Sequence, residues 1–462
     1  MQKLAHFKNK NIAVLGAGLT GLSCVRFLQK NNLPCAVNDS REEPTNLIAF
    51  KENFPKVNLF VGSWNTQLIS SADILIVSPG VDLNEVQKAH NIKSTCEVIG
   101  DVELYCQLSN TPIIAVTGSN GKSTVVSLLH YLGKQLGYKT QLGGNIGIPV
   151  LDTINETFDY LILELSSFQL ETLNSMQALA ATILNISDDH LDRHKTIENY
   201  SQIKQKIYAQ AAVAVINRDD SATYYAKSST NSQQISFGSD QPEHGQEHSH
   251  FGVIAFKEQL FLTYGDEKLI ALSELPLAGM HNALNYLAAL ALGSQAGWSL
   301  TAMVQNLAGF KGLPHRCQRV ESSDGVQWIN DSKATNVGAT LAAIKGLSDV
   351  TKVNQQFILI AGGEGKGADF KPLKTVITQH VNLLYTIGKD GHKIAELTKN
   401  SATHCIQVSS LEEAVSLASI VVKSGDTVLL SPACASLDMF KSFAERGQVF
   451  IQAVNSVQGG KL

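Results

Sequence analysis

Residues 118–124, with the sequence GSNGKST, combine the residue types that bind nucleotide phosphates. The N–H groups of a glycine-rich turn and a helix N-terminus surround phosphate oxygens, a lysine neutralises them, and a hydroxyl binds Mg2+. The spacing is one residue shorter than the usual GxxxxGK[ST] pattern. Because a strand-like run, the turn, Lys-Ser-Thr and a helix follow in order, we interpret the segment as a variant P-loop that binds a nucleotide rather than a plain Gly/Ser turn. Its residues are Gly118, Ser119, Asn120, Gly121, Lys122, Ser123 and Thr124.

A second glycine-rich turn follows the first apolar segment of the chain. Gly16, Gly18 and Gly21 are followed by Asp39, at about the distance of the ribose-binding acid in dinucleotide folds. Three interpretations are open: an NAD site, a helix N-terminus that binds the pyrophosphate of another nucleotide such as a UDP-sugar, or glycines that only permit close packing.

Two polar clusters follow apolar runs in the middle of the chain. Glu164 ends the run 160–163, and His190 lies in the segment 188–194 after the run 178–186. An unpaired buried charge costs roughly several kcal/mol, so Glu164 requires a cation. We expect the two clusters to converge, because the carboxyl ends of parallel strands share one edge of a sheet. A metal-binding role and a core or capping role for His190 are both open.

Short loops in the last third of the chain carry charged side chains. They are the hinge segment 312–316 and the segments 330–336, 362–367 and 431–436. Such loops are suited to binding anionic substrates, although ordinary solvated loops have the same composition.

Alternating strand-like and helical segments predict the scaffold that positions these loops. The strand-like segments are 11–15, 34–38, 72–78, 112–116, 160–165, 178–186, 357–360, 383–387 and 427–430. Such alternation is typical of parallel sheets, and 462 residues are enough for about three domains. We predict an α/β fold with a Rossmann-like domain at 1–100, a central P-loop ATPase-like parallel sheet at 101–311 and a Rossmann-like α/β domain at 312–462. Residues 221–250 are expected to form an exposed connection or weak edge structure.

The composition excludes several classes of protein. Hydrophobic residues make up 44% and charged residues 17% of the chain, and the formal net charge is -4. These values fit a soluble globular protein and disfavour nucleic acid as the main partner. No apolar run approaches the roughly 18 residues of a membrane span, and the seven cysteines form no CxxC pair. We therefore expect a cytoplasmic protein with reduced thiols and no membrane anchor.

Nine segments together resemble the Mur ligase family over nearly the whole chain. They are GAGLTGLS (16–23), TGSNGKST (117–124), GGNIG (143–147), LELSSFQLE (163–171), DDHLDRH (188–194), GMHNALN (279–285), GLPHR (312–316), NDSKATN (330–336) and SPACASLDMF (431–440). Among members of the family, the segments are most similar to those of the ligases that add D-glutamate.

The resemblance implies an ATP-dependent, amide-forming enzyme of peptidoglycan synthesis. The N-terminal domain would bind the UDP of UDP-MurNAc-L-alanine, the central domain ATP and Mg2+, and the C-terminal domain D-glutamate. The first glycine motif would then bind uridine diphosphate rather than NAD. Mn2+ is a possible substitute metal, because histidine is an uncommon ligand of Mg2+. We further expect a monomer.

The resemblance also assigns residues to each site. Lys122, Glu164, His190 and Lys204 would be catalytic, with Lys204 carbamylated, and the metal would be held by Ser123 (or Thr124), Glu164, His190 and Lys204. Beyond the P-loop, the ATP site would include Asn282, Asn285, His315, Arg316, Asp331 and Lys333. The UDP-substrate site would consist of Leu19, Thr20, Asp39, Arg41, Gly80 and Asn145. D-glutamate would bind Thr335, Lys366, Ser436 and Phe443.

Several alternatives remain for the sequence alone. Lys204 has the ordinary interpretation of a solvated helical lysine, and Lys206 is a second choice for the modified residue. An NAD-dependent dehydrogenase would leave the P-loop unexplained. A non-enzymatic P-loop switch would bind nucleotide without substrate-dependent phosphate release. Within the family, ligases that add L-alanine, a diamino acid or a dipeptide, and folylpolyglutamate synthetase, fit the segment 431–440 less well.

Overall fold

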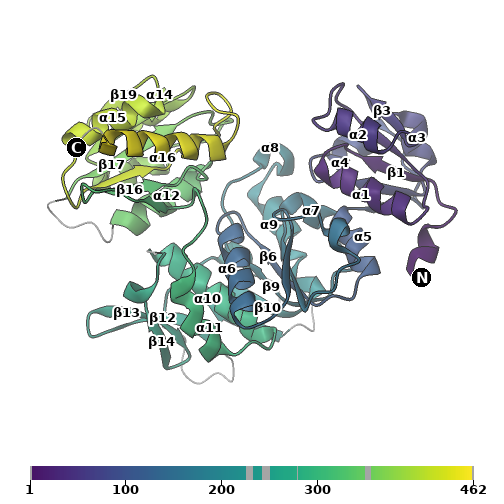
Figure 1. Cartoon of the computed structure of the whole chain (residues 1–462), viewed down its shortest axis with the longest axis horizontal. Helices are drawn as coiled ribbons and strands as arrows, with labels where there is room; N and C mark the ends of the chain where they lie inside the picture. Colours follow the sequence, from purple (N-terminus) through teal and green to yellow (C-terminus); the bar gives the residue numbers. More distant parts are fainter. Residues whose placement is uncertain (1–2, 225–232, 242–249, 278, 349–354, 460–462) are drawn as a thin grey trace.

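The computed structural model describes residues 3–224, 233–241, 250–277, 279–348 and 355–459. Within these residues the chain forms three α/β units, each built on its own sheet (Figure 1). No described helix combines the length and the apolar character that crossing a membrane requires.

The N-terminal unit contains a five-stranded parallel sheet. Its strand order is β3 (Asn58–Val61), β2 (Cys35–Asp39), β1 (Ile12–Leu15), β4 (Ile74–Val77), β5 (Glu97–Ile99). The helices are η1 (Lys3–Phe7), α1 (Leu19–Lys30), α2 (Leu47–Asn53), α3 (Thr66–Ser71) and α4 (Leu83–Ala89). The strand order reverses between β1 and β4, and ligands of doubly wound sheets bind at the carboxyl ends of the strands at such a point.

The central unit contains a nine-stranded sheet. Its order is β14 (Glu267–Ala271), β13 (Gln259–Tyr264), β12 (His250–Phe256), β11 (Gln233–Phe237), β10 (Ala211–Asn217), β9 (Ala178–Ile183), β6 (Ile113–Thr117), β8 (Tyr160–Glu164), β7 (Thr140–Gly144). The helices are α5 (Asp101–Leu108), α6 (Lys122–Gln135), α7 (Ser167–Glu171), α8 (Leu191–His194), α9 (Ile197–Gln205), α10 (Met280–Gln295) and α11 (Leu300–Asn306), with short turns η2 (Val150–Thr153), η3 (Tyr208–Gln210), η4 (Ser221–Thr223), η6 (Leu272–Glu274) and η7 (Leu307–Gly309).

The structure confirms and refines one expectation for this unit and corrects another. The sheet is parallel from β7 to β12, but β12, β13 and β14 pair antiparallel, because short turns join these strands as hairpins. The segment 221–250 was expected to be an exposed connection or weak edge, yet β11 lies inside the sheet between β10 and β12, with Ile235 and Phe237 buried. Residues 225–232 and 242–249 of that segment lie outside the described part of the chain.

The C-terminal unit contains a six-stranded sheet. Its order is β15 (Gln318–Val320), β16 (Gln327–Asn330), β20 (Thr427–Leu430), β17 (Phe357–Gly362), β18 (Leu383–Ile387), β19 (His404–Gln407). Only β15 runs antiparallel to its neighbour. The helices are α12 (Val337–Ser348), α13 (Leu373–His380), α14 (Gly391–Ala395), η8 (Glu396–Thr398), α15 (Leu411–Val421) and α16 (Phe443–Gly459).

The three units differ in how their cores connect. One hydrophobic cluster contains Val14 and Leu28 of the N-terminal unit together with Leu161 and Leu163 of the central sheet. The clusters of the C-terminal unit consist of residues from 317 onward. The N-terminal and central units therefore share apolar burial, whereas the C-terminal unit has a core of its own.

Candidate active site

A cleft of about 660 Å³ lies at the carboxyl ends of β1 and β4, where the strand order predicts a ligand. Residues of the central unit, among them Gly144 and Gln169, form part of its wall. All six residues assigned to the UDP substrate line this cleft: Leu19, Thr20, Asp39, Arg41, Gly80 and Asn145.

The three glycines of the first turn have different surroundings. Gly16 has a φ of 95°, and a Cβ there would lie 2.9 Å from the Ser78 side chain. A Cβ on Gly21 would lie 1.9 Å from the Gly16 carbonyl oxygen, so this glycine allows α1 to pack closely on the turn. A Cβ on Gly18 would have no atom within 4 Å. Gly18, which precedes α1 and lines the cleft, therefore leaves the helix N-terminus open to a phosphate.

Asp39 is held entirely by protein groups. The Ala17 N–H donates to Oδ2 at 2.9 Å, and Arg41 donates through Nε to Oδ1 at 2.9 Å and through Nη2 to Oδ2 at 2.7 Å. Burial raises the pKa of Asp39, but these hydrogen bonds outweigh it and hold the pKa below its usual value. The contacts support Asp39 as the residue that orients Arg41 and the glycine turn in the cleft.

The P-loop connects β6 to α6 in a geometry suited to phosphate. Gly118 and Gly121 have φ values of 146° and 85°. Asn185, which follows β9, accepts from the Ser119 N–H at its carbonyl oxygen (2.9 Å) and from the Asn120 N–H at Oδ1 (2.8 Å). Gly121 begins α6 without a side-chain cap, so the N–H groups of its first turn are available to a ligand.

Lys122 folds back on this loop. Its Nζ donates to the carbonyl oxygens of Gly118 at 2.6 Å and Ser119 at 2.8 Å. Burial lowers the pKa of Lys122, although Glu164 and Asp189 oppose the shift. The ammonium thus lies beside the loop that is expected to bind phosphates.

Glu164 lies at the carboxyl end of β8 and is only 2% exposed. Asn145 donates from Nδ2 to Glu164 Oε1 at 2.8 Å, while the buried Oε2 has no hydrogen-bond partner. A buried carboxylate with a free oxygen fits a divalent cation, which takes oxygen ligands. The resemblance assigns a hydroxyl of Ser123 (or Thr124), in the first turn of α6, to the same ion.

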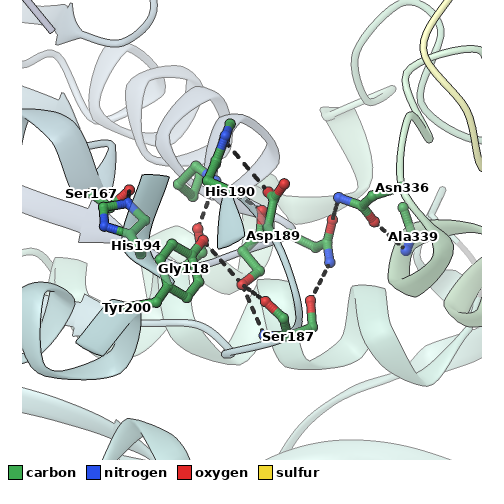
Figure 2. A network of polar contacts seen from close by, with 12 residues as sticks. Gly118, Ser167, Ser187, Asp189, His190, His194, Tyr200, Asn336 and Ala339 are labelled. Carbon is green, nitrogen blue, oxygen red and sulfur yellow. Dashed lines mark hydrogen bonds and ion pairs between the residues drawn. The ribbon is translucent and has the colours of Figure 1, made fainter. Parts of the chain in front are cut away.

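His190 is positioned by a left-handed turn with a φ of 54°. Its imidazole is 48% exposed, lies 3.7 Å from Asp189 Oδ2, and packs edge-on against Phe168 with ring centroids 4.9 Å apart. Figure 2 shows this residue beside the P-loop network. The described residues include no group of three or more His, Cys, Asp or Glu side chains that would hold a metal by themselves. Any ion here would need hydroxyl, carbamate or phosphate oxygens as well.

Lys204 projects from α9 beneath the P-loop and is 1% exposed. Its Nζ donates to Thr117 Oγ1 at 3.0 Å and to the Gly118 carbonyl oxygen at 3.2 Å, and lies 4.7 Å from the centre of the Tyr200 ring. Burial and the nearby Lys122 ammonium hold the pKa of Lys204 well below its usual value. Low basicity favours the neutral amine, the form that reacts with CO2.

The C-terminal unit reaches the P-loop through polar contacts. Arg316 Nη2 donates to Ser123 Oγ at 2.7 Å, and Asn336 Nδ2 donates to Asn120 Oδ1 at 3.4 Å. Figure 2 shows the second contact continuing to Ser187, to which Asn120 Nδ2 donates at 3.4 Å. The hinge and the loop after β16 are thereby joined to the nucleotide loop.

The other residues assigned to ATP lie close to these contacts. Asp331 accepts from the Cys317 N–H at 3.1 Å and from Ser431 Oγ at 2.8 Å, and burial raises its pKa to about 7. On α10, Asn285 Nδ2 donates to Asn282 Oδ1 at 3.2 Å. The Lys333 ammonium lies 4.1 Å from the centre of the Phe443 ring. His315 packs edge-on against the same ring, at 6.2 Å between centroids.

The residues assigned to D-glutamate are more dispersed. Lys366 is exposed on the turn after β17, Ser436 is buried in the loop after β20, and Thr335 and Phe443 are partly buried. The two loops pair through Glu364 and Ala435, but the described contacts include none between the four assigned side chains.

Several residues that build the site were not found by sequence reasoning. Asn185 and Ser187 follow β9, so the rule that ligands bind at strand ends could have indicated them. The fully buried Arg446 on α16 donates to the carbonyl oxygens of Ser332 (2.7 Å) and Cys434 (3.1 Å), and so joins two of the predicted loops. Its position within a helix carries no local signal of this role.

Comparisons with known proteins agree with this geometry. Residues 10–100 match the N-terminal domain of MurD-like Mur ligases, residues 116–293 the Mur ligase middle domain and residues 315–434 the glutamate ligase domain of Mur ligases. The UDP-N-acetylmuramoylalanine--D-glutamate ligase of Colwellia psychrerythraea is 53% identical over 99% of both chains. The enzyme of the same name from Haemophilus ducreyi is 43% identical, over 96% of this chain and 97% of that one.

Solved structures show the same fold at lower identity. The MurF ligase of Thermotoga maritima in complex with ADP has a TM-score of 0.61 and 17% identity, covering 98% of this chain and 97% of that one. UDP-N-acetylmuramate-alanine ligase MurC from the same organism has a TM-score of 0.59 and 16% identity, covering 97% and 100%. The three matched domains and the full-length relatives lead to one conclusion: the chain belongs to the Mur ligase family.

Proposed function

We propose that this protein joins D-glutamate to UDP-MurNAc-L-alanine in cytoplasmic peptidoglycan synthesis, with ATP as the energy source. The products are UDP-MurNAc-L-Ala-D-Glu, ADP and phosphate. The observation that carries the proposal is the 53% identity to a UDP-N-acetylmuramoylalanine--D-glutamate ligase over 99% of both chains. The cleft lined by all six residues assigned to UDP and the variant P-loop before α6 support the proposal.

The chemistry requires activation of a carboxylate. The L-alanine carboxylate attacks the γ-phosphorus of ATP, ADP leaves, and an acyl phosphate forms. The amine of D-glutamate attacks the acyl carbon and loses a proton, and the tetrahedral intermediate collapses with loss of phosphate. Anionic groups approach each other in both steps, so positive charge at the P-loop supplies much of the catalysis. Lys122 is suited to stabilise the transferred phosphoryl group, because its ammonium lies against the carbonyl oxygens of the loop.

The donor set fits Mg2+, which would screen charge on phosphate and carboxylate oxygens when bound. The unpartnered Glu164 Oε2 supports this assignment. Ser123 (or Thr124), His190 and a carbamylated Lys204 would complete the ligand set, and the imidazole favours Mn2+ as a substitute. Carbamylation gives Lys204 anionic oxygens, which an ordinary lysine lacks.

The remaining assignments are part of the same proposal. The nucleotide site is completed on domain closure by Asn282, Asn285, His315, Arg316, Asp331 and Lys333, and D-glutamate is bound by Thr335, Lys366, Ser436 and Phe443. We also propose that the enzyme works as a cytoplasmic monomer divided into domains at 1–100, 101–311 and 312–462.

The decisive experiment measures phosphate release from ATP by the purified protein. We expect release only when both UDP-MurNAc-L-alanine and D-glutamate are present. L-Glutamate and L-lysine serve as matched controls for the amino acid. Equal turnover with either control would contradict the D-glutamate assignment, and release that depends on neither substrate would contradict ligation.

A further inference from the structure

Asp101 is a buried carboxylate in the sugar-nucleotide cleft to which neither the sequence motifs nor the proposed mechanism assign a role. It is the first residue of α5, where the chain passes from the N-terminal sheet to the central sheet. Asp101 is 3% exposed. It lines the cleft of about 660 Å³ together with Asn145 and Gln169.

One oxygen of Asp101 lacks a partner in the protein. Oδ1 is buried without a hydrogen bond, and none of the ion pairs found within the described segments includes this carboxyl group. Burial raises the pKa of Asp101 to about 6, and the backbone N–H groups of Val102 and Asp101 offset only part of the shift. Oδ1 is therefore a buried acceptor without a donor in the protein, an unfavourable state that a ligand can relieve.

The charges around the cleft limit which part of a substrate can reach Asp101. The open N-terminus of α1 at Gly18 attracts the diphosphate, which a carboxylate would repel. The substrate carboxylate has to reach the P-loop, on the side where Asn145 contacts Glu164. The part of the substrate that can approach Asp101 is therefore the uncharged part between the diphosphate and the carboxylate. This part is an N-acetylated sugar, which has hydroxyl and amide donors.

We infer that the Asp101 carboxylate accepts a hydrogen bond from a hydroxyl or amide N–H of the N-acetylmuramoyl group and thereby selects the complete sugar nucleotide over shorter uridine nucleotides. This inference rests on the proposed function and adds a residue that determines substrate specificity. It also explains why a carboxylate is kept in an otherwise unfavourable place.

The test compares two ligands on the full-length chain by calorimetry. Asp101→Ala is expected to bind UDP-MurNAc-L-alanine about tenfold or more weakly, the range for a lost hydrogen bond to a charged group, and to bind UDP as the unaltered protein does. Asp101→Asn keeps the shape but offers a neutral acceptor, so its loss should be smaller. KM for UDP-MurNAc-L-alanine should rise in parallel, with KM for ATP and D-glutamate unchanged.

Glu52→Gln is the control, because Glu52 is an exposed carboxylate of the N-terminal unit that is not among the residues lining the cleft. It should leave both affinities unchanged. Retained UDP binding shows that the cleft of each Asp101 variant is intact. Should the Ala variant fail to fold, the Asn variant decides the question.

Two results would overturn the inference while leaving the proposed function standing. Equal weakening for UDP and for UDP-MurNAc-L-alanine would assign Asp101 a purely structural role. Unchanged affinity for both would mean that Oδ1 is met by water in the small cavity of about 10 Å³ that Asp101 also lines. If the unaltered protein fails to bind UDP-MurNAc-L-alanine, the proposed function fails, and the inference falls with it.

Discussion

Lys122 and Lys204 are two lysines that share one carbonyl oxygen of the P-loop. The Nζ atoms of Lys122 and Lys204 lie 2.6 and 3.2 Å from the Gly118 oxygen, and the Lys122 charge lowers the pKa of Lys204. Two ammonium groups this close repel each other, and Lys204 is the one with almost no exposure. The arrangement favours a charged Lys122 and a neutral Lys204, and only a neutral amine can react with CO2.

For Lys122 we expect loss of catalysis without loss of structure. Lys122→Ala removes the ammonium that balances the transferred phosphoryl group, so kcat should fall about a hundredfold or more. Phosphate release measures the effect, and circular dichroism monitors the fold. Lys134→Ala, an exposed lysine on the same helix, is the control and should retain full activity. Near-normal turnover of the Lys122 variant would refute its role at the phosphate.

For Lys204 we expect a modification by CO2. Mass spectrometry of gently prepared protein should find the added mass of one CO2 on this residue. Removal of CO2 should lower the activity and bicarbonate should restore it. Lys204→Ala should be inactive, whereas Lys206→Ala, two positions later and exposed, should behave like the unaltered protein. Full activity of the Lys204 variant would rule the carbamate out.

Asp101 should also give the ligand-free protein a pH-dependent stability. Its pKa is about 6 in the folded chain, against about 3.9 when unfolded. Between these values the folded state binds more protons, so the free energy of unfolding falls as pH rises, by about 3 kcal/mol in total. Asp101→Asn should lack this component. Urea unfolding of both proteins between pH 4 and 7 measures the difference, and parallel curves would argue against the raised pKa.

At the scale of elements, the turn between β1 and α1 offers a matched pair of substitutions. Gly21→Ala places a Cβ against the Gly16 carbonyl oxygen and should lower the thermal midpoint by several degrees. Gly18→Ala meets no protein atom within 4 Å and should leave stability unchanged, yet weaken UDP binding because the methyl group enters the cleft. Unchanged UDP affinity of the Gly18 variant would place the diphosphate elsewhere.

Most of the predicted strands have both faces buried, but burial alone did not decide the outcome, because β10 and β16 lie inside their sheets and were not predicted. β1, β4, β6, β8 and β9 are continuous apolar runs, as expected for central strands of parallel sheets. β3 and β19 are edge strands of four residues with mostly exposed side chains, so any apolar run in them is short. β7, also at an edge, ends in two glycines and resembles a loop in sequence.

The residues of the candidate site also differ in whether the local sequence marks them. Residues within a single strand, turn and helix, such as those of the P-loop, could be found locally. The contact of Arg316 with Ser123 joins positions 193 residues apart, and only the resemblance to a family placed both at one nucleotide. No pattern could indicate Asp101, because its significance depends on burial between two units.

For the whole molecule, the shared core predicts which parts fold together. A chain of residues 1–311 should unfold in one cooperative transition and bind UDP as the full chain does. Residues 1–100 alone should not fold stably, because Val14 and Leu28 belong to a cluster that extends to Leu161 and Leu163. Calorimetry of both fragments measures this. A cooperative transition of the shorter fragment would contradict the prediction.

The N-terminal and central units share an apolar core, whereas the C-terminal unit has its own. This difference limits which parts of related enzymes can be exchanged. A cleft transferred from a related enzyme would need the central unit as well as the N-terminal unit, because residues of both units line it. The C-terminal unit meets the P-loop through Arg316 and Asn336, and its helix α12 packs on α10, so a foreign unit would have to reproduce these contacts but no shared core. In this architecture the C-terminal unit is the part most readily exchanged, and the cleft lined by the N-terminal and central units is the part most firmly embedded.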